Sequence, residues 1–459
     1  MNRKFLLLPA FLFLFWTAGA QDEKVPEQKT AFSLKEAQEY ALINNTSVKN
    51  AIIDIEIAKK KVWETTAIGL PQVNGNVNYQ NVFTVPEMSF GGYIDWASMD
   101  PSIPLTSGDV LSHYVMPEPI QLGVKENVTW DITVSQLIFS GEYIVGLQAA
   151  KTFQQVSALS LEKAKIETKL LIKETYTLVQ ILEENRKIIT NSLENTEKIL
   201  ADLQATNKVG FLDQTSVDQL ELTTHNLTNA KISVEKQINT VKLLLKYQMG
   251  MNMDQEISLT ESAETILSTV ESDKILLQPF DIGKNIDYQM LEVQEEITSL
   301  SLKRQKSTNL PTLSAFYRHQ EQMKTPEFNF TSPDMIGVSL KVPIFASGTR
   351  HVKIQQAKLE LLQIENNKLN VEQALNMQVE QARNSFITAN NKYILEKDNL
   401  DLSKRIYDNT LIKFQNGSVS SMELTQAQNQ MLNTQMGYFT AILDLLKAKN
   451  TLDKAINNY

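Results

Sequence analysis

The sequence predicts a mainly helical protein that also carries a small membrane β-sheet, with this architecture present twice in the chain. Repeated spacing is the first observation: Asn45 precedes Pro71 by 26 positions, and Asn285 precedes Pro311 by the same interval. Long runs of helical periodicity are the second, and four segments of alternating apolar and polar residues are the third. Each copy is therefore expected to contain one helix, two strands and one long helical hairpin.

A second matched pair of segments indicates the length of the hairpins. Residues 138–141 correspond to residues 344–348, and each segment is followed after 69 positions by another glycine, Gly210 or Gly417. A helix of that length extends about 100 Å, because an α-helix rises about 1.5 Å per residue. The molecule is therefore expected to be elongated, with Gly210 and Gly417 at the tips of its two hairpins.

Residues 1–20 have the pattern of a secretory signal peptide. A basic start that includes Arg3 leads into a short apolar run, and small residues precede the expected cleavage after Ala20. The alternative is a transmembrane anchor, but Pro9 interrupts the run, which is shorter than the about 20 residues of a membrane span. We expect an exported protein with an N-terminal tail at 21–32.

Composition restricts how the exported chain reaches a membrane and what it binds. The sequence has no cysteine, which leaves neither a disulfide framework nor a lipid-anchored cysteine. Its net charge of −9 argues against nucleic acid as a partner, because phosphate binding requires clustered Lys and Arg. No later segment is apolar enough for a membrane helix, so any contact with membrane lipid must come from strands.

Helical periodicity gives the long elements of each copy. A capping-box pattern at Ser33 predicts one helix to about Thr66, and the second copy repeats it over residues 285–307. The hairpins are predicted at 142–208 with 216–249, and at 349–413 with 420–457. The first hairpin contains apolar residues at alternating seven- and four-residue steps, typical of a helix packed side by side on another: Leu171, Leu178, Leu182, Ile189, Leu193 and Leu200.

These elements divide the chain into two repeats and a connection. Repeat 1 is predicted over 33–249 and repeat 2 over 284–459, with a connecting segment at 250–283. Repeat 1 also contains a longer loop between its strands, residues 84–125, which is suited to an extracellular plug or contact surface.

The four alternating segments are predicted strands. They are residues 72–83, 128–135, 313–320 and 335–344, and the third is the weakest because Phe316 falls on its polar side. A soluble sheet with one wet face gives the same alternation. The many amides and hydroxyls of the polar face favour a membrane sheet in an exported chain. Since four strands cannot close a barrel, several copies must combine their strands.

Taken together, the duplicated helix–strand–strand–helix–helix unit, the Leu-Pro before each first strand and the tip glycines resemble the TolC family of outer-membrane efflux and export channels. The likeness covers residues 33–457. It implies a homotrimer whose strands form a twelve-stranded barrel in the outer membrane and whose helices form a periplasmic tunnel. It also implies a periplasmic adaptor and an inner-membrane pump of the RND or ABC type as partners, and an equatorial position for residues 250–283.

The resemblance also implies an entrance at the hairpin tips. In the second hairpin, the family's aromatic position is Phe414 and its first acidic position is Glu423. The second acidic position falls on Gln426 and the expected basic residue on Val419. Three copies of Glu423 would form one carboxylate ring, and Gly210 with Gly417 would contact the adaptor. A solvated charge at a helix start is the alternative interpretation of Glu423.

The first hairpin matches the family's entrance less closely. Its threonine is Thr215, but the acidic position that follows is Ser216, with Asp218 two places later. Asp218 is also interpretable as an ordinary acid in the first turn of a helix.

The sequence contains no catalytic motif and no cofactor motif, so the chain is predicted not to be an enzyme. The leading function is a passive exit duct of a multicomponent efflux or type I-like secretion system. The alternative is a periplasmic or surface coiled-coil scaffold without a pore, which would have no need of strands with one polar and one apolar face.

Overall fold

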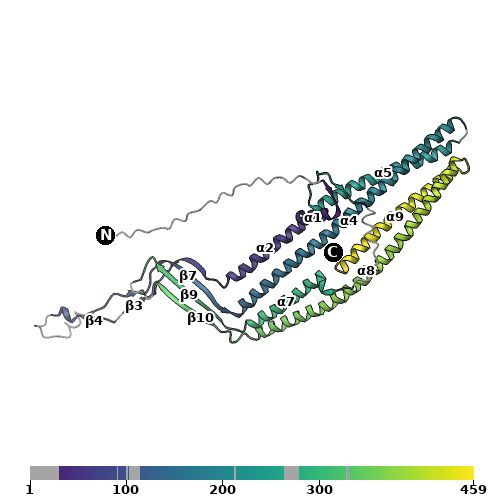
Figure 1. Ribbon diagram of the computed structural model, residues 1–459. Helices are drawn as coiled ribbons and strands as arrows, with labels where there is room; N and C mark the ends of the chain where they lie inside the picture. Colours follow the sequence, from purple (N-terminus) through teal and green to yellow (C-terminus); the bar gives the residue numbers. More distant parts are fainter. Residues whose placement is uncertain are drawn as a thin grey trace.

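The computed structural model shows an elongated molecule with a β-sheet at one end and the tips of two helical hairpins at the other (Figure 1). The structure describes residues 30–89, 91–99, 102, 114–210, 213–262, 279–326, 329 and 331–458. The predicted signal peptide, residues 1–20, lies outside the described residues. The predicted fold class, long helical hairpins with four principal strands, is confirmed.

The first predicted helix is wrong in one respect, because it is two helices. α1 (Leu34–Asn44) begins with the predicted capping box at Ser33, and α2 (Thr46–Ala67) follows after a break at Asn45. Asn45 has extended backbone angles, and its side chain accepts hydrogen bonds from the backbone N–H groups of Ser47 and Val48. Its Nδ2 donates to the carbonyl of Gln248 at 2.7 Å. The break is therefore set by a helix cap and by a contact distant in sequence.

Four strands form one antiparallel sheet in the order β10-β9-β7-β2. Their bounds are β2 (Gln72–Asn81), β7 (Glu126–Ser140), β9 (Thr312–Gln322) and β10 (Asp334–Lys341). Each copy of the repeat contributes one adjacent pair, and β7 joins β9 across the repeats. β7 is nearly twice as long as the segment predicted for it and has a register shift between Leu137 and Phe139. β2 and β10 are the two edges of the sheet.

The sheet has one apolar and one polar face, as predicted. Paired residues Val73 and Val134 lie on the apolar face with Tyr317 and Ile336, because directly opposed residues of neighbouring strands project to the same side. On the polar face, Asp131 accepts hydrogen bonds from Asn76 and Thr133, each at 3.1 Å.

Phe316 is explained by its neighbour across the strands. It pairs with Gly337, and a Cβ built on Gly337 would lie 2.6 Å from the Phe316 ring. The ring covers the glycine on the polar face, an arrangement that protects exposed backbone in a sheet.

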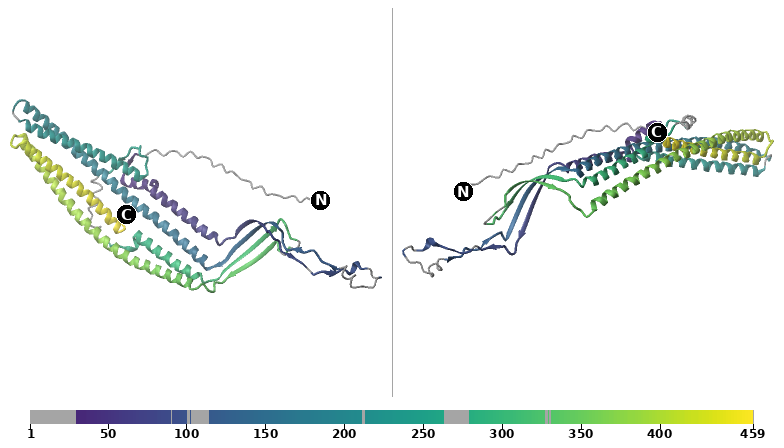
Figure 2. Two further views of the ribbon diagram at one scale, coloured as in Figure 1. Left: turned by 180° about the vertical axis from the view of Figure 1, so that it is seen from behind. Right: turned by 90° about the horizontal axis from the view of Figure 1, so that it is seen from below.

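The long loop extends the sheet as a narrow ribbon, away from the helices (Figure 2). Two short ladders are described within it: β3 (Glu87–Met88) with β6 (Ile120–Gln121), and β4 (Tyr93–Ile94) with β5 (Tyr114–Val115). A short 3-10 helix, η1 (Trp96–Ser98), follows β4. The role of this loop as plug or contact surface stays a prediction.

The two hairpins lie side by side along the length of the molecule (Figures 1 and 2). The first consists of α4 (Gly141–Lys208) and α5 (Gln214–Met249), and the second of α8 (Thr349–Gln415) and α9 (Ser421–Ala455). α7 (Ile286–Ser307) corresponds to α2 and follows the 3-10 helix η3 (Ile282–Lys284). Of the predicted seam on α4, Ile189 and Leu193 are buried, whereas Leu171 is exposed in the single chain.

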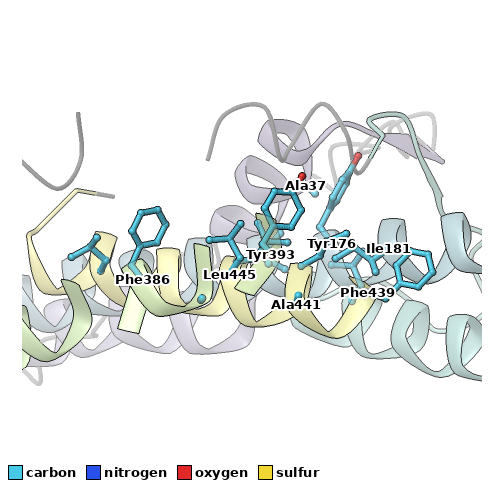
Figure 3. Close-up of a cluster of buried hydrophobic side chains, with 14 of the residues drawn as sticks. Ala37, Tyr176, Ile181, Phe386, Tyr393, Phe439, Ala441 and Leu445 are labelled. Atoms are coloured by element: carbon cyan, nitrogen blue, oxygen red, sulfur yellow. The ribbon is translucent and has the colours of Figure 1, made fainter. Parts of the chain in front are cut away.

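The largest apolar cluster lies where both hairpins meet the N-terminal segment (Figure 3). Tyr176, Phe386, Tyr393 and Phe439 fill it, and the hydroxyl of Tyr176 donates to the carbonyl of Phe32 at 3.0 Å. Beside this cluster, β1 (Ala31–Phe32) and β8 (Ser258–Leu259) form a parallel pair. Burial of Tyr176 raises the pKa of its hydroxyl, which therefore stays protonated and available as a donor.

A buried ion cluster lies beside this core. The carboxylate of Asp453 accepts two hydrogen bonds from Lys449 Nζ, at 2.7 and 2.9 Å. It also accepts a 3.4 Å hydrogen bond from Lys173 of α4. Burial lowers the pKa of Lys449, and the pairing with Asp453 opposes that effect. The cluster connects α9 to α4, so it links the two hairpins.

Candidate functional site

The hairpin tips are built on glycines in the left-handed region. Gly210 has φ +83° and Gly417 has φ +70°, conformations that side chains with a Cβ rarely adopt. At the second tip, the N–H of Gly417 donates to the carbonyl of Phe414, and the N–H of Ser418 donates to the carbonyl of Lys413. These two hydrogen bonds end α8. Both glycines lie at the tips, as the sequence predicted, and their role in adaptor contact stays a prediction.

The returning helices begin with side-chain caps. Asp213 accepts a hydrogen bond from the backbone N–H of Ser216 at 2.7 Å, and Ser420 accepts one from Glu423 at 3.3 Å. Tight glycine turns followed by capped helix starts give each tip a defined direction.

Glu423 is exposed in the first turn of α9. Its carboxylate accepts a 3.3 Å hydrogen bond from the Ser420 hydroxyl, so it is both part of a cap and free to face water. At the other tip Thr215 and Asp218 are exposed, and Asp218 accepts a 2.8 Å hydrogen bond from Gln214. The structure therefore fits either interpretation of these residues, and the entrance ring stays a prediction.

Phe414 has a different environment from the two carboxylates. It is half buried and packs against a second apolar cluster that includes Tyr407 of α8, Leu424 of α9 and Leu220 of α5. Residues from all four hairpin helices meet in this cluster, which we name the tip cluster: Ile199, Leu203, Val217, Leu220, Tyr407, Leu424, Ala427 and Met431. Phe414 thus stabilises the tip by packing.

A set of polar contacts joins the two hairpins and was not predicted from the sequence. The Ser421 hydroxyl donates to Ser216 at 2.8 Å, in a buried contact between the starts of α9 and α5. Further along α9, Gln428 donates to Thr196 at 2.7 Å.

Gln435 continues this seam with a 3.2 Å bond to Asn185. Ser421, Gln428 and Gln435 are seven residues apart, and each is less than 10% exposed. Buried polar residues at heptad spacing were the available sequence signal, but only the structure supplies their partners.

Two observations concern membrane spans and metal binding. In the described part of the chain, no helix is long and apolar enough to cross a membrane. The same residues contain no cluster of three or more His, Asp or Glu side chains arranged to hold a metal ion.

Solved structures with this fold include outer membrane channels. The chain aligns with CusC, known from crystal structures, at 14% identity and a TM-score of 0.71, with 92% of each chain covered. It aligns with VceC of Vibrio cholerae at 14% identity and a TM-score of 0.66, over 92% of this chain and 95% of that one. It aligns with the CmeC outer membrane channel of Campylobacter jejuni at 17% identity and a TM-score of 0.67, over 93% of this chain and 85% of that one.

Part of the sequence also matches a protein-family model. Residues 289–458 match the model described as outer membrane efflux protein. No curated protein matches the sequence significantly. The fold of the described residues is the one found in outer membrane channels of known structure. Over residues 289–458 the chain is similar to the outer membrane efflux protein family.

Proposed function

We propose that three copies of this chain form one channel-tunnel, and that this channel is the passive exit duct of a multicomponent efflux or secretion system. Channels of the family form trimers in efflux systems. The observation that carries the proposal is that the sheet has unpaired edge strands and the helices have an exposed apolar face.

Both edge strands of the described sheet have one side without a neighbouring strand. Among the described strands, β2 pairs only with β7 and β10 pairs only with β9, so each edge strand has one row of backbone groups without a described strand partner. Such an edge cannot be exposed to lipid, because each unsatisfied polar group costs several kcal/mol there. Three copies, joined β2 to β10, would form a closed barrel of twelve strands.

Among the helices, α8 exposes an apolar face. Its buried residues, such as Val379, Phe386 and Tyr393, lie on one side, whereas many large apolar residues are exposed. At 100° per residue, the exposed set falls within about a third of the helix circumference, away from the buried side. This set, which we name the α8 stripe, is Val352, Leu359, Leu362, Leu369, Met377, Ile387, Ile394, Leu395, Leu402, Ile406 and Ile412.

Exposed large apolar residues that recur on one side of a helix over this length indicate a partner. A second copy supplies one in the geometry that also joins the sheet edges, since α8 follows directly from the edge strand β10. Complementary exposed apolar residues occur on the repeat 1 side, at Ile52, Ile53, Leu243 and Tyr247. The single chain is thus one segment of a ring.

A ring of this kind provides a path but no energy. The proposed system therefore includes an inner-membrane pump of the RND or ABC type, and a periplasmic adaptor that contacts the tips at Gly210 and Gly417. The duct would extend from the outer membrane into the periplasm over the length of the hairpins.

The proposal is tested on protein purified from outer membranes. We expect a heat-modifiable trimer on denaturing gels and discrete conductance steps in planar bilayers, with adaptor and pump recovered after crosslinking in cells. A monomer under native conditions, or a trimer that conducts no ions, would contradict the proposal, and the second outcome would favour a scaffold without a pore.

A further inference from the structure

The distal part of α9 lacks charge over an unusual length. No residue from Leu424 to Leu443 is Asp, Glu, Lys, Arg or His. The antiparallel helix α8 runs beside it, and the 2.8 Å ion pair of Lys392 with Asp444 aligns the two. Over the matching interval α8 has exposed charges at Lys392, Lys397, Asp398, Asp401, Lys404, Arg405, Asp408 and Lys413. Two neighbouring helices thus differ sharply in charge.

The exposed side of this α9 segment is a stripe of uncharged polar residues. Its members recur at steps of three and four, which places them on one face of the helix. This face, which we name the amide stripe, consists of Gln426, Asn429, Gln430, Asn433 and Thr440, with Met422 and Met436. Charged residues occur only at its ends, where Glu423 lies at the tip and Asp444 at the other end.

A shallow groove follows the tip end of the stripe. It has a volume of about 370 Å³ and also involves Gln219 of α5. The lining therefore offers amide donors and acceptors in a row, with no fixed charge among them: Gln219, Met422, Thr425, Gln426, Asn429, Gln430 and Asn433.

The neighbours of α9 restrict where the amide stripe faces. On one side α9 packs along α8. On the other side it contacts the first hairpin, through Ser421 with Ser216, Gln428 with Thr196 and the tip cluster. Because both flanks are covered by its own chain, the free face in a ring of helices points either into the tunnel or to the outside.

Charge distinguishes these two directions. Surfaces that face bulk water carry mixed charges, and the exposed sides of α4 and α8 do so in this chain. In a narrow tunnel, by contrast, a fixed charge is amplified by low-dielectric walls and holds any solute of opposite sign. An uncharged hydrogen-bonding wall avoids that effect.

We propose that the amide stripe lines the distal tunnel and forms a charge-neutral wall, suited to small polar solutes without a large net charge. Electrostatic discrimination is then confined to the Glu423 ring at the mouth. This inference rests on the proposed function, because it requires a tunnel closed by several copies.

Charge placed on the stripe provides the main test, in planar bilayers with the full-length protein. Asn433→Lys should lower the cation-to-anion permeability ratio by about threefold or more, and Asn433→Glu should raise it by a similar factor, because each adds three charges around one lumen. The matched control is Asn191→Lys, at an exposed amide of α4 among charged neighbours, which should leave the ratio unchanged.

A labelling experiment gives an independent readout, since the chain has no cysteine. A positively charged thiol reagent should reduce single-channel current through Asn433→Cys channels and leave Asn191→Cys channels unaffected. Normal current and selectivity in both Asn433 variants would overturn the inference.

The outcomes also separate this inference from the proposed function. If the wild-type protein forms no channel, the proposed function fails. If it conducts, but Asn433→Lys alters export in cells without altering selectivity, the amide stripe is instead an outer docking face, and the neutral wall is refuted while the duct stands.

Discussion

The two repeats share a plan but differ in how much of their longest helix is covered. α4 packs against α1, α2, α5 and α7, and its middle turns are buried around Ile172, Tyr176 and Val179. α8 packs mainly against α7 and α9, and its apolar residues at Leu369 and Leu395 are 59% and 63% exposed. The first helix is thus central in the single chain, and its counterpart is peripheral.

The difference also appears at the start of each helix. Ser140 caps α4 through its side chain, whereas Gly348, the residue before α8, is in the left-handed conformation and provides no side-chain cap. The two copies thus share the length of this helix and the tip, while the environments of the two helices differ. One copy became the interior of the protomer, and the other kept an open face for a second chain.

The largest expected effect follows from a charge in that open face. Leu395→Glu should abolish the trimer, because it removes about 2 to 3 kcal/mol of apolar burial at each of three contacts and buries unpaired carboxylates. Native gels of detergent-extracted protein measure this. Leu395→Met, which keeps the apolar volume, should retain the trimer. A stable trimer of Leu395→Glu would show that α8 does not face the next copy.

The connection between the repeats provides the second prediction. Asp453→Asn leaves the buried Lys449 and the partly buried Lys173 without this anion, so the free energy of unfolding should fall by about 3 to 5 kcal/mol. The change is measured as a loss of thermal stability of the purified protein. As the control, Lys454→Gln removes an exposed pair with Glu167 and should cost at most about 1 kcal/mol. Equal effects of both variants would remove the structural role assigned to Asp453.

The tips of the two repeats should respond alike to backbone strain. Gly417→Val should cost about 1 to 2 kcal/mol locally, because φ is +70° at this glycine. No atom lies within 4 Å of the place that a Cβ would occupy, so conformation and not collision opposes the change. Export in cells should fall while trimers still form, and Gly210→Val should act similarly.

The control for the tips is Gly146→Ala, inside α4, where a Cβ also meets nothing within 4 Å and φ is not left-handed. Alanine there should be neutral or stabilise by about 0.5 to 1 kcal/mol. Full export activity of Gly417→Val would refute the proposed tip contact.

The smallest effect on stability should come from Glu423. Glu423→Gln removes one charge per copy from an exposed helix start, so the free energy of unfolding should change by less than about 1 kcal/mol. Cation over anion selectivity and block by trivalent cations should nevertheless decrease in planar bilayers, because Gln426 offers no second carboxylate. Unchanged selectivity would identify Glu423 as an ordinary surface charge.

Much of the fold could be predicted from the sequence because its signals are local and repeated. Helical periodicity, strand alternation and the two tip glycines each act within a few residues, and duplication gave every element a second instance. The break at Asn45 could not be predicted, since it depends on a bond to Gln248, about two hundred positions away. Phe316 likewise became clear only when the register placed Gly337 opposite it.

The candidate site was less predictable for a related reason. Phe414 could be located at the tip, but its packing onto Tyr407 and Leu424 depends on how two hairpins come together. The seam of Ser421, Gln428 and Gln435 has a visible seven-residue spacing, yet its partners lie on the other hairpin. Sequence periodicity indicates which residues share a face, and the fold determines what that face meets.

Pairing between the edges of this sheet and those of neighbouring copies can be tested with engineered cysteines. Val77 lies on β2 and Val338 on β10. Three strand spacings separate the two strands in one chain, so the residues are at least about 14 Å apart, too far for a disulfide within the chain. With Val77→Cys fixed and a second cysteine moved along β10 around Val338, oxidation in membranes should give covalent dimers and trimers at one register. Monomers alone at every position along β10 would contradict the shared barrel.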